Sequence, residues 1–437
     1  MVMADSGPSI SSGAGASYSR RLIDDELDEL LEGLSAIAVE GPRAVGKTAT
    51  ALQRARTVYQ LDDGAVLAIV QADPGRLVRG DMPVLIDEWQ RFPESFDRVR
   101  RAVDAGAAPN SFLLTGSASP KDPPTHSGAG RIVRVRLRPM SLAERGISRP
   151  TVSLRRLLDG SRGPVAGTTQ TGLENYVHEI VRSGLPGLMP LRGRLLRARL
   201  DGYLDGIVDH DFEELGQTVR RPQLLRRWMA AYAAATSTVA SYEKIRDAAE
   251  GGSERPPSRS TAHAYRDALE RLFILDPVPA WLPTTNRLAQ LASPPKHHLA
   301  DPAFAARLLD VNEAALLAGK QGSPGIRREG TLLGALFESL VTQSVRVYAQ
   351  AAEARVSHLR THRGDHEIDL IVERDGGALA IEVKLTQVPS ERDVQHLRWL
   401  EGQLGDQVLD SVIITTGPEA YRRPDGIAVI PAALLGP

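Results

Sequence analysis

The pattern of apolar and polar positions over the first 140 residues predicts strands that alternate with helices. Short apolar runs predict five strands, at residues 36–40, 58–61, 84–87, 112–115 and 132–137. Amphipathic stretches predict helices between most of them, and the clearest lie at 24–34, 47–56 and 94–105. Because strands and helices alternate in this way when helices cover a parallel sheet, we expect an α/β fold.

The remainder of the chain predicts two further regions. From residue 173 to about 272 the pattern is mostly helical, and a Gly/Pro-rich break follows at 321–325. Beyond the break we expect a helix at 332–348, strands around 356, 368 and 379, a helix from about 390 and a strand at 412–416. The predicted organisation is a floppy tail at 1–19, an α/β domain at 20–160, a linker at 160–172, a helical region at 173–320 and a smaller α/β domain at 326–437.

Composition excludes several classes of protein. Of the 437 residues, 42% are hydrophobic and 24% are charged, which excludes a fully disordered chain. The absence of cysteine excludes disulfides, thiolate zinc sites, iron–sulfur clusters and a cysteine nucleophile. No stretch reaches the length of about 18 apolar residues that a membrane-spanning helix needs. We therefore expect a cytoplasmic protein without a membrane partner.

The basic residues are unevenly distributed, although the net charge is only −1. Residues 131–200 contain 14 arginines, no lysine and 4 acidic residues. Such a stretch either meets phosphates or forms a solvated arginine-rich surface. Because the chain favours arginine, a position that keeps lysine is expected to need a compact ammonium group and not a planar guanidinium group. The six lysines are Lys47, Lys121, Lys244, Lys296, Lys320 and Lys384.

A glycine-rich turn after the first predicted strand matches the phosphate-loop pattern G-x-x-x-x-G-K-[ST]. Glycines let the backbone curl so that N–H groups point at phosphate oxygens, and the lysine ammonium reaches the outer phosphates. The threonine hydroxyl is a ligand for Mg²⁺. The predicted nucleotide-binding residues are Gly41, Pro42, Arg43, Ala44, Val45, Gly46, Lys47 and Thr48.

Two acids at the end of the third predicted strand support the same site. Asp87 is placed to hold Mg²⁺ together with Thr48, and Glu88 to orient and deprotonate the attacking water. The fourth strand ends in Thr115-Gly-Ser117, where a hydroxyl can meet the γ-phosphate or the water. Arg131 is a candidate for stabilising transition-state charge, within the subunit or across an interface of a homo-oligomer, or is simply exposed. No guanine-specific motif occurs, so ATP is the expected nucleotide.

The order G-P-R-A-V-G-K-T, L-I-D-E-W-Q, F-L-L-T-G-S and G-R…R-P-M-S-L-A-E resembles a prokaryotic group of AAA-type ATPases with a C-terminal domain of unknown function. The resemblance covers the chain from about residue 20 to its end. It implies a sensor strand between the phosphate-loop strand and the Asp-Glu strand. It further implies that Ser117 is the sensor, that Lys47 and Thr48 bind nucleotide, and that Asp87 and Glu88 serve the metal and the water.

The helical region contains a pattern similar to the winged-helix module of the same group. Two predicted helices, 242–250 and 258–272, are followed by short apolar segments at 273–275 and 281–282 that suit a β-wing. The second helix would present Arg259, His263, Arg266 and Arg271 to DNA. The segment between the helices is longer than the turn of a DNA-binding helix-turn-helix, so packing or protein contact is the alternative.

The last region carries a second chemical signal. Glu382 and Lys384 stand two apart on a predicted strand and therefore face the same side, and Asp369 lies on the preceding strand. With Glu338 in a helix, these residues resemble the PD-(D/E)-x-K nuclease superfamily, which implies Mg²⁺ held by carboxylates. His358, His362 and His366 recur every four residues, but their run predicts strand and turn, which disfavours a metal-binding helix face.

The sequence thus predicts an ATP-binding, Mg²⁺-dependent P-loop ATPase with a helical, winged-helix region and a nuclease-like tail. One function is ATP hydrolysis coupled to action on DNA. The alternative is a nucleotide-gated switch that binds a protein partner and carries an inactive nuclease-like fold.

Overall fold

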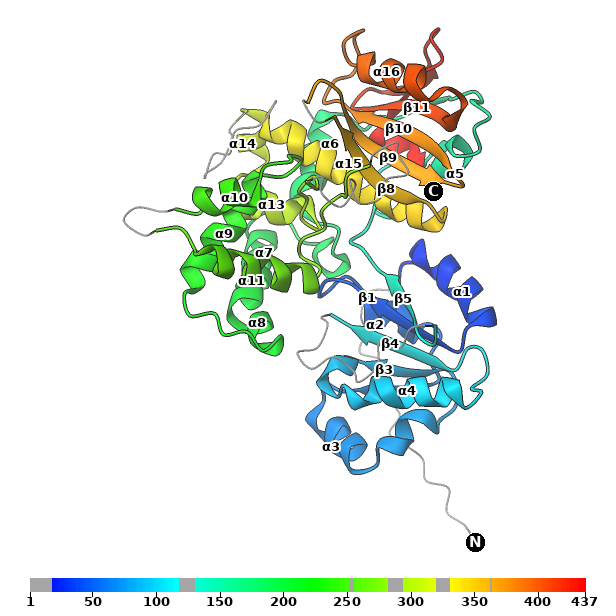
Figure 1. Ribbon diagram of the computed structural model, residues 1–437, viewed down its shortest axis with the longest axis vertical. Helices are drawn as coiled ribbons and strands as arrows, with labels where there is room; N and C mark the ends of the chain where they lie inside the picture. The colour runs from blue at the N-terminus through cyan, green and yellow to red at the C-terminus, as the bar shows by residue number, and fades with distance from the viewer. Residues whose placement is uncertain (1–17, 118–129, 251–254, 282–293, 320–330, 362–363) are drawn as a thin grey trace.

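The computed structural model describes residues 18–117, 130–250, 255–281, 294–319, 331–361 and 364–437 (Figure 1). Most of the predicted tail, residues 1–17, lies outside these ranges. None of the helices in the described ranges combines the length and apolar character needed to cross a lipid bilayer.

The first region is built on a five-stranded parallel sheet. In chain order its strands are β1 (Ala36–Glu40), β2 (Thr57–Gln60), β3 (Val84–Asp87), β4 (Phe112–Gly116) and β5 (Val133–Arg136). They lie in the order β2-β3-β4-β1-β5, and every adjacent pair is parallel. The predicted α/β fold is confirmed, and β4 lies between β1 and β3 as the resemblance implies.

Helices cover both faces of this sheet because its buried strands are apolar on both sides. The helices are α1 (Ile23–Gly33), α2 (Lys47–Leu52), α3 (Gly64–Ala72) and α4 (Glu94–Asp104). In β1, Ile37 and Val39 join a core with α1 and α2, whereas Ala36 and Ala38 join a second core with α3 and α4. Figure 1 shows α4 lying across β3 and β4.

The second region is helical and lies beside the sheet in Figure 1. Its helices are α6 (Leu173–Arg182), α7 (Gly193–Gly206), a π-helical turn (Ile207–Asp211), α8 (Phe212–Glu214), α9 (Pro222–Ala234), α10 (Tyr242–Ala248), α11 (Arg259–Arg271), α13 (Pro302–Leu308) and α14 (Glu313–Leu317). After α11, the described residues of the predicted β-wing and the segment between them form isolated bridges in place of strands: Leu275 with Leu299, Val278 with Lys296 and Ala280 with His358. Leu282 of that wing lies outside the described residues.

The third region is a seven-stranded mixed sheet covered by α15 (Leu332–Ala351) and α16 (Gln395–Leu404). Its strand order is β7 (Gly167–Thr168), β12 (Glu419–Arg422), β13 (Ala428–Pro431), β11 (Val408–Thr415), β10 (Gly377–Val383), β9 (Glu367–Arg374) and β8 (Arg355–Arg360). Part of the segment expected to be a linker, 160–172, is therefore an edge strand, because β7 pairs with β12. Just before it, β6 (Val152–Ser153) pairs with β14 (Leu435–Gly436) and leads into α5 (Leu154–Leu157).

One buried carboxylate ties the first region to the other two. Asp276 follows α11, and its oxygens lie 3.2 Å from Arg136, 3.0 Å from Arg138 and 3.0 Å from Arg346. Although burial opposes ionisation, these guanidinium groups hold the pKa of Asp276 well below its usual range. Because Arg136 and Arg138 lie at the end of β5 and Arg346 lies on α15, this ion cluster joins three parts of the chain.

Buried histidines predict that acid destabilises the fold. His297 is buried, its Nε2 lies 2.7 Å from the Ala240 carbonyl oxygen, and its Nδ1 lies 3.3 Å from the Tyr232 hydroxyl. Burial lowers its pKa from 6.5 to about 4, so the unfolded chain binds the proton first as pH falls. We expect the free energy of unfolding to decrease between pH 6.5 and 4, by about 3 kcal/mol from this group.

Urea unfolding at pH 7 and at pH 5 measures this loss. The pH dependence should shrink in His297→Gln, which does not titrate in this range. The substitution of the exposed His210 by Gln is the control and should leave the dependence unchanged, because His210 forms no ion pair with any described residue. An equal dependence in the wild type and in His297→Gln contradicts the assignment.

Candidate functional site

The predicted phosphate loop connects β1 to α2 and has the curled backbone that such a loop needs. Gly41, Ala44 and Gly46 have φ values of +156°, +59° and +105°. The Lys47 ammonium lies inside the loop, 3.0 Å from the Gly41 carbonyl oxygen and 2.8 Å from that of Pro42. Burial lowers its pKa to about 8, although Glu88 and Asp87 act in the opposite direction. Helix α2 ends at Leu52, four residues before the predicted end.

The end of β3 lies against this loop, as the sequence predicts. Asp87 is buried, and its Oδ1 accepts a hydrogen bond of 2.9 Å from the Thr48 hydroxyl and another from the Thr115 hydroxyl. A hydroxyl and a carboxylate that meet at one sheet edge are oxygen ligands of the kind that Mg²⁺ prefers. The predicted metal ligands Thr48 and Asp87 therefore fit a magnesium ion.

Glu88 lies at the same edge in a left-handed backbone conformation, with φ of +53°. Its Oε2 accepts a hydrogen bond of 3.3 Å from the Ser117 hydroxyl and another from the Gln90 amide. A non-glycine residue in this conformation is strained, and such strain concentrates at functional sites. The structure thus brings Glu88 and Ser117 together beside Lys47. Gln90 was missed, although it follows Glu88 closely in the LIDEWQ segment.

Arg131 is not brought to the phosphate loop. It precedes β5, whose first residue pairs with Ile37 near the start of β1, so Arg131 lies at the opposite end of the sheet. Its guanidinium is half exposed and lies 2.8 Å from Asp104 at the end of α4. A role across a subunit interface remains a prediction.

The loop also contacts the helical region, which the sequence did not indicate. Arg43 forms ion pairs with Asp211 in the π-helical turn and with Glu214 in α8. Arg91, in the 3₁₀ turn Trp89–Arg91 after Glu88, lies 3.1 Å from the other oxygen of Glu214. Burial raises the pKa of Asp211 to about 6 against the opposing effect of Arg43.

A second cluster lies in the third region and contains all four predicted nuclease-like residues. Glu338 of α15, Asp369 of β9, Glu382 of β10 and Lys384 line one cleft of about 1310 Å³. Lys384 lies 2.6 Å from Glu382 Oε1, and Asp369 Oδ2 accepts a hydrogen bond of 2.9 Å from the Val383 amide. The predicted juxtaposition of these side chains is present in the fold.

A residue that was not assigned to this site lies at its centre. The Lys296 ammonium is 3.0 Å from Glu338, 3.1 Å from Glu367 and 2.9 Å from Asp369. Burial lowers the pKa of such an amine, but these carboxylates raise it well above the usual value. The sequence feature that could have indicated Lys296 is the scarcity of lysine, since the chain contains only six.

Burial and neighbouring charges give the carboxyl groups of this cluster different pKa values. Burial, reinforced by the charge of Asp369, raises the pKa of both Glu338 and Glu382 to about 8. Burial also opposes ionisation of Asp369, but the ammonium groups of Lys296 and Lys384 hold its pKa below the usual value. Asp369 is therefore the ionised carboxylate of the cluster, stabilised by contact with Lys296 and by the nearby charge of Lys384.

The described residues contain no group of three or more His, Asp or Glu side chains arranged to hold a metal ion. The histidines of the four-residue repeat are separated: His358 is buried on β8, and His366 stacks on Trp399 with ring centroids 4.0 Å apart. His362 lies outside the described residues.

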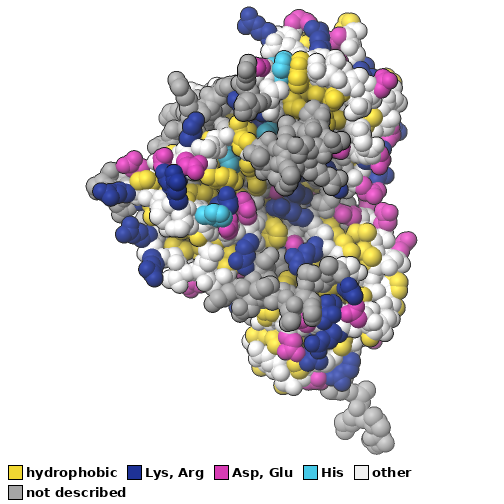
Figure 2. Space-filling model, in the orientation of Figure 1, with side chains coloured by type: hydrophobic (Ala, Val, Ile, Leu, Met, Phe, Trp, Pro, Cys, Tyr) yellow, Lys and Arg dark blue, Asp and Glu magenta, His cyan; other side chains and the backbone are white. Residues whose placement is uncertain are grey.

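Many side chains of the arginine-rich stretch are used in internal ion pairs rather than free for phosphates. Arg134 pairs with Glu40, Arg145 with Glu179, and Arg162 with Glu401. Figure 2 shows Lys and Arg side chains interspersed with Asp and Glu.

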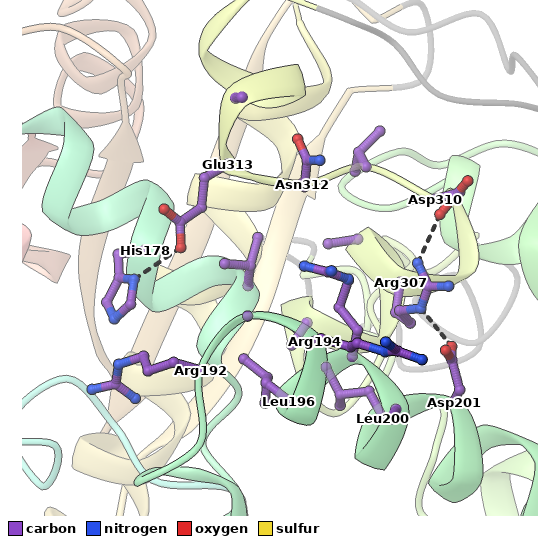
Figure 3. Close-up of a pocket in the computed structure, with 18 residues that line it drawn as sticks. His178, Arg192, Arg194, Leu196, Leu200, Asp201, Arg307, Asp310, Asn312 and Glu313 are labelled. Atoms are coloured by element: carbon purple, nitrogen blue, oxygen red, sulfur yellow. Dashed lines mark hydrogen bonds and ion pairs between the residues drawn. The ribbon is translucent and has the colours of Figure 1, made fainter.

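Three arginines at the end of the same stretch, Arg192, Arg194 and Arg197, line a pocket of about 980 Å³ in the helical region (Figure 3). Acidic residues line it as well, in the pairs His178–Glu313, Arg307–Asp201 and Arg307–Asp310. The pocket is therefore not a simple basic surface.

Side chains of the candidate DNA-reading helix, α11, also form contacts with other residues of the chain. Arg266 lies over the Tyr242 ring, 4.8 Å from its centroid, and 3.0 Å from Asp267. His263 pairs with the same Asp267 at 2.9 Å. Arg259 and Arg271 are the first and last residues of α11. A DNA-binding role for these four residues remains a prediction.

Comparison with protein families divides the chain into three parts. Residues 34–145 match the model of an AAA domain, residues 173–315 match a domain of unknown function (DUF8612), and residues 333–435 match another (DUF4143). The uncharacterized proteins Mb2031c of Mycobacterium bovis and Rv2008c of Mycobacterium tuberculosis are each 25% identical over 421 residues, covering 94% of this chain and 83% of theirs.

Among solved structures, the Walker-type ATPase PABY2304 of Pyrococcus abyssi matches at 15% identity and a TM-score of 0.37, covering 65% of this chain and 94% of its own. That score is too low to establish a shared architecture. The AAA-domain match and the phosphate-loop geometry both indicate that the first region is a P-loop, nucleotide-binding domain of the AAA ATPase type.

The close approach at Gly41 predicts that a single methyl group disables this loop. A Cβ at this position would lie 2.2 Å from the Leu137 carbonyl oxygen, and that oxygen is held by the backbone after β5. We expect Gly41→Ala to destabilise the fold by about 1–3 kcal/mol and to weaken ATP binding at least about tenfold. Gly64→Ala is the control, since a Cβ there meets nothing within 4 Å. Unchanged ATP affinity in Gly41→Ala, measured by calorimetry, contradicts this prediction.

Proposed function

We propose that this protein hydrolyses ATP in a Mg²⁺-dependent reaction at the junction of the phosphate loop and β3. The observation that carries the proposal is the convergence of Lys47, the Thr48–Asp87 pair and the Glu88–Ser117 pair on one sheet edge. Thr48 and Asp87 would hold Mg²⁺, which would supply positive charge against the charge that develops on the phosphate oxygens.

The remaining groups have separate roles in the proposed reaction. Lys47 turns from the carbonyl oxygens of its own loop to the outer phosphates. Glu88 accepts the proton of the attacking water, and its hydrogen bonds from Ser117 and Gln90 fix the direction of its carboxylate. Preorganised donors and acceptors of this kind stabilise the transition state without further reorganisation.

Two substitutions separate binding from hydrolysis. Lys47→Ala should abolish ATP binding, because no other ammonium reaches the loop among the described residues. Glu88→Gln should retain binding and lose about 10²–10⁴ in turnover, because the amide cannot accept the proton. Phosphate release and calorimetric titration with ATP measure the two effects. Wild-type turnover in both variants would remove the ATPase proposal.

We also propose that nucleotide state is transmitted to the helical region through Arg43. This side chain belongs to the phosphate loop but is paired with Asp211 and Glu214 of the helical region. An incoming triphosphate competes for the same guanidinium, so the nucleotide-bound and nucleotide-free states differ in this contact. A differential contact of this kind is what a two-state coupling requires.

Competition for Arg43 predicts that removal of an acidic partner strengthens ATP binding. Glu214→Gln should bind ATP about three- to tenfold more tightly, which corresponds to about 1 kcal/mol for a partly exposed ion pair. Glu213→Gln is a matched control, because the Glu213 carboxylate lies next to Glu214 in the chain but forms no ion pair with any other described residue. Calorimetry measures both variants. Unchanged or weaker binding in Glu214→Gln contradicts the coupling.

For the third region we propose a nuclease-like fold, supported by the shared cleft of Glu338, Asp369, Glu382 and Lys384. The winged-helix character of the helical region, DNA as a partner and assembly into a homo-oligomer also stand as proposals. The second candidate function is a nucleotide-gated switch that binds a protein partner. The Lys296 ammonium within the carboxylate cluster favours this candidate over an active nuclease.

A further inference from the structure

A positive charge that belongs to the chain itself lies buried against the carboxylates that line the nuclease-like cleft. The side chain of Lys296 is 1% exposed, and its ammonium contacts three carboxylates from α15 and β9 at 2.9–3.1 Å. Two of these contacts, to Glu338 and Asp369, are hydrogen bonds, and the third, to Glu367, is an ion pair. Lys296 is therefore held within the cluster by three carboxylates.

The backbone around Lys296 holds it in this position. Its N–H and C=O both pair with Val278, each with a donor–acceptor distance of 2.9 Å. On one side, His358 Nε2 lies 3.2 Å from the Pro294 carbonyl oxygen. On the other, the N–H of His297 donates to the Thr238 carbonyl oxygen at 2.9 Å. Hydrogen bonds on both sides of Lys296 thus fix the segment of the helical region that places the ammonium among the carboxylates.

One buried carboxyl oxygen of the cleft has no hydrogen-bond partner among the described residues. Glu382 is buried, and its Oε2 accepts no hydrogen bond from any described residue, although its Oε1 pairs with Lys384. Four carboxyl groups belong to the cluster (Glu338, Glu367, Asp369 and Glu382), and three cationic side chains pair with them: Lys296, Lys384 and Arg360, whose guanidinium lies 2.6 Å from Glu367. A buried acceptor without a partner is costly, which suits a site shaped for a cation of higher charge.

We propose that Lys296 is a built-in counterion that occupies the divalent-cation position of this cleft and keeps Mg²⁺ and Mn²⁺ out. The inference rests on the nuclease-like assignment of the cleft and is independent of ATP hydrolysis. It gives a physical reason why the described carboxylates form no metal-binding arrangement: they are spaced around an ammonium. It also explains why lysine is present here in an arginine-rich chain, since a compact charge fits where a planar guanidinium does not.

Binding of Mn²⁺ to the full-length chain without nucleotide tests this proposal. Wild type should bind Mn²⁺ weakly, and Lys296→Gln should bind it at least about tenfold more tightly, as read by electron paramagnetic resonance. The gain should vanish in Lys296→Gln/Asp369→Asn. Lys244→Gln is the matched control, because Lys244 lines the same cleft without an ion pair to any described residue, and it should behave as wild type.

Two results overturn the proposal. One is a folded Lys296→Gln, judged by circular dichroism, that binds Mn²⁺ no better than wild type. The other is wild type that binds Mn²⁺ at submillimolar concentration at a site removed by Glu382→Gln. This second measurement decides the question even where Lys296→Gln does not fold. ATP turnover of the same preparations reports separately on the phosphate-loop site, so failure of one proposal is distinguishable from failure of the other.

Discussion

Compensation of buried charge is the constraint on which the rest of this structure depends. A buried ionised group is tolerated only where opposite charge or hydrogen-bond donors lie close to it. Lys47 is buried beside Asp87 and Glu88, Asp276 beside three arginines, and Lys296 beside three carboxylates. In each case the partners come from different elements, so each charge holds elements together as well as being held by them.

The helical region contributes residues to both the phosphate-loop site and the carboxylate cleft. Any coupling between these two sites can therefore involve the helical region. Asp211 and Glu214 contact Arg43 of the phosphate loop, and Lys296 enters the carboxylate cleft of the third region. Asp276 lies between these two points in the chain and joins β5 to α15. The helical region therefore contacts both centres, although coupling between them requires two states of the elements that connect them.

Several arginines of the 131–200 stretch have structural roles. The concentration of arginine at 131–200 suggested a surface for phosphates, but Arg134, Arg136, Arg138 and Arg145 are all in ion pairs within the fold. A planar guanidinium can satisfy two or more acceptors at once, which suits the junctions between regions. Charge counted along a sequence therefore says little about charge available at a surface.

Local sequence determined the elements and the phosphate-loop chemistry. The strands at 36–40 and 84–87 and the loop between Gly41 and Thr48 lie where periodicity and spacing predict them, because a buried parallel strand and a phosphate loop need particular residues at short range. The pairing of Thr48 with Asp87 follows from parallel strands that end at one edge.

Tertiary structure alone decided the long-range partners. Nothing near residue 43 indicates Asp211, and nothing near Asp369 indicates Lys296, because such contacts depend on how separate regions pack. The same reason made an edge strand of residues 167–168, whose partner β12 lies some 250 residues away. Short-range pattern identifies the secondary structure or motif of a segment. Which distant residue neutralises a charged side chain in that segment is determined only when the chain has folded.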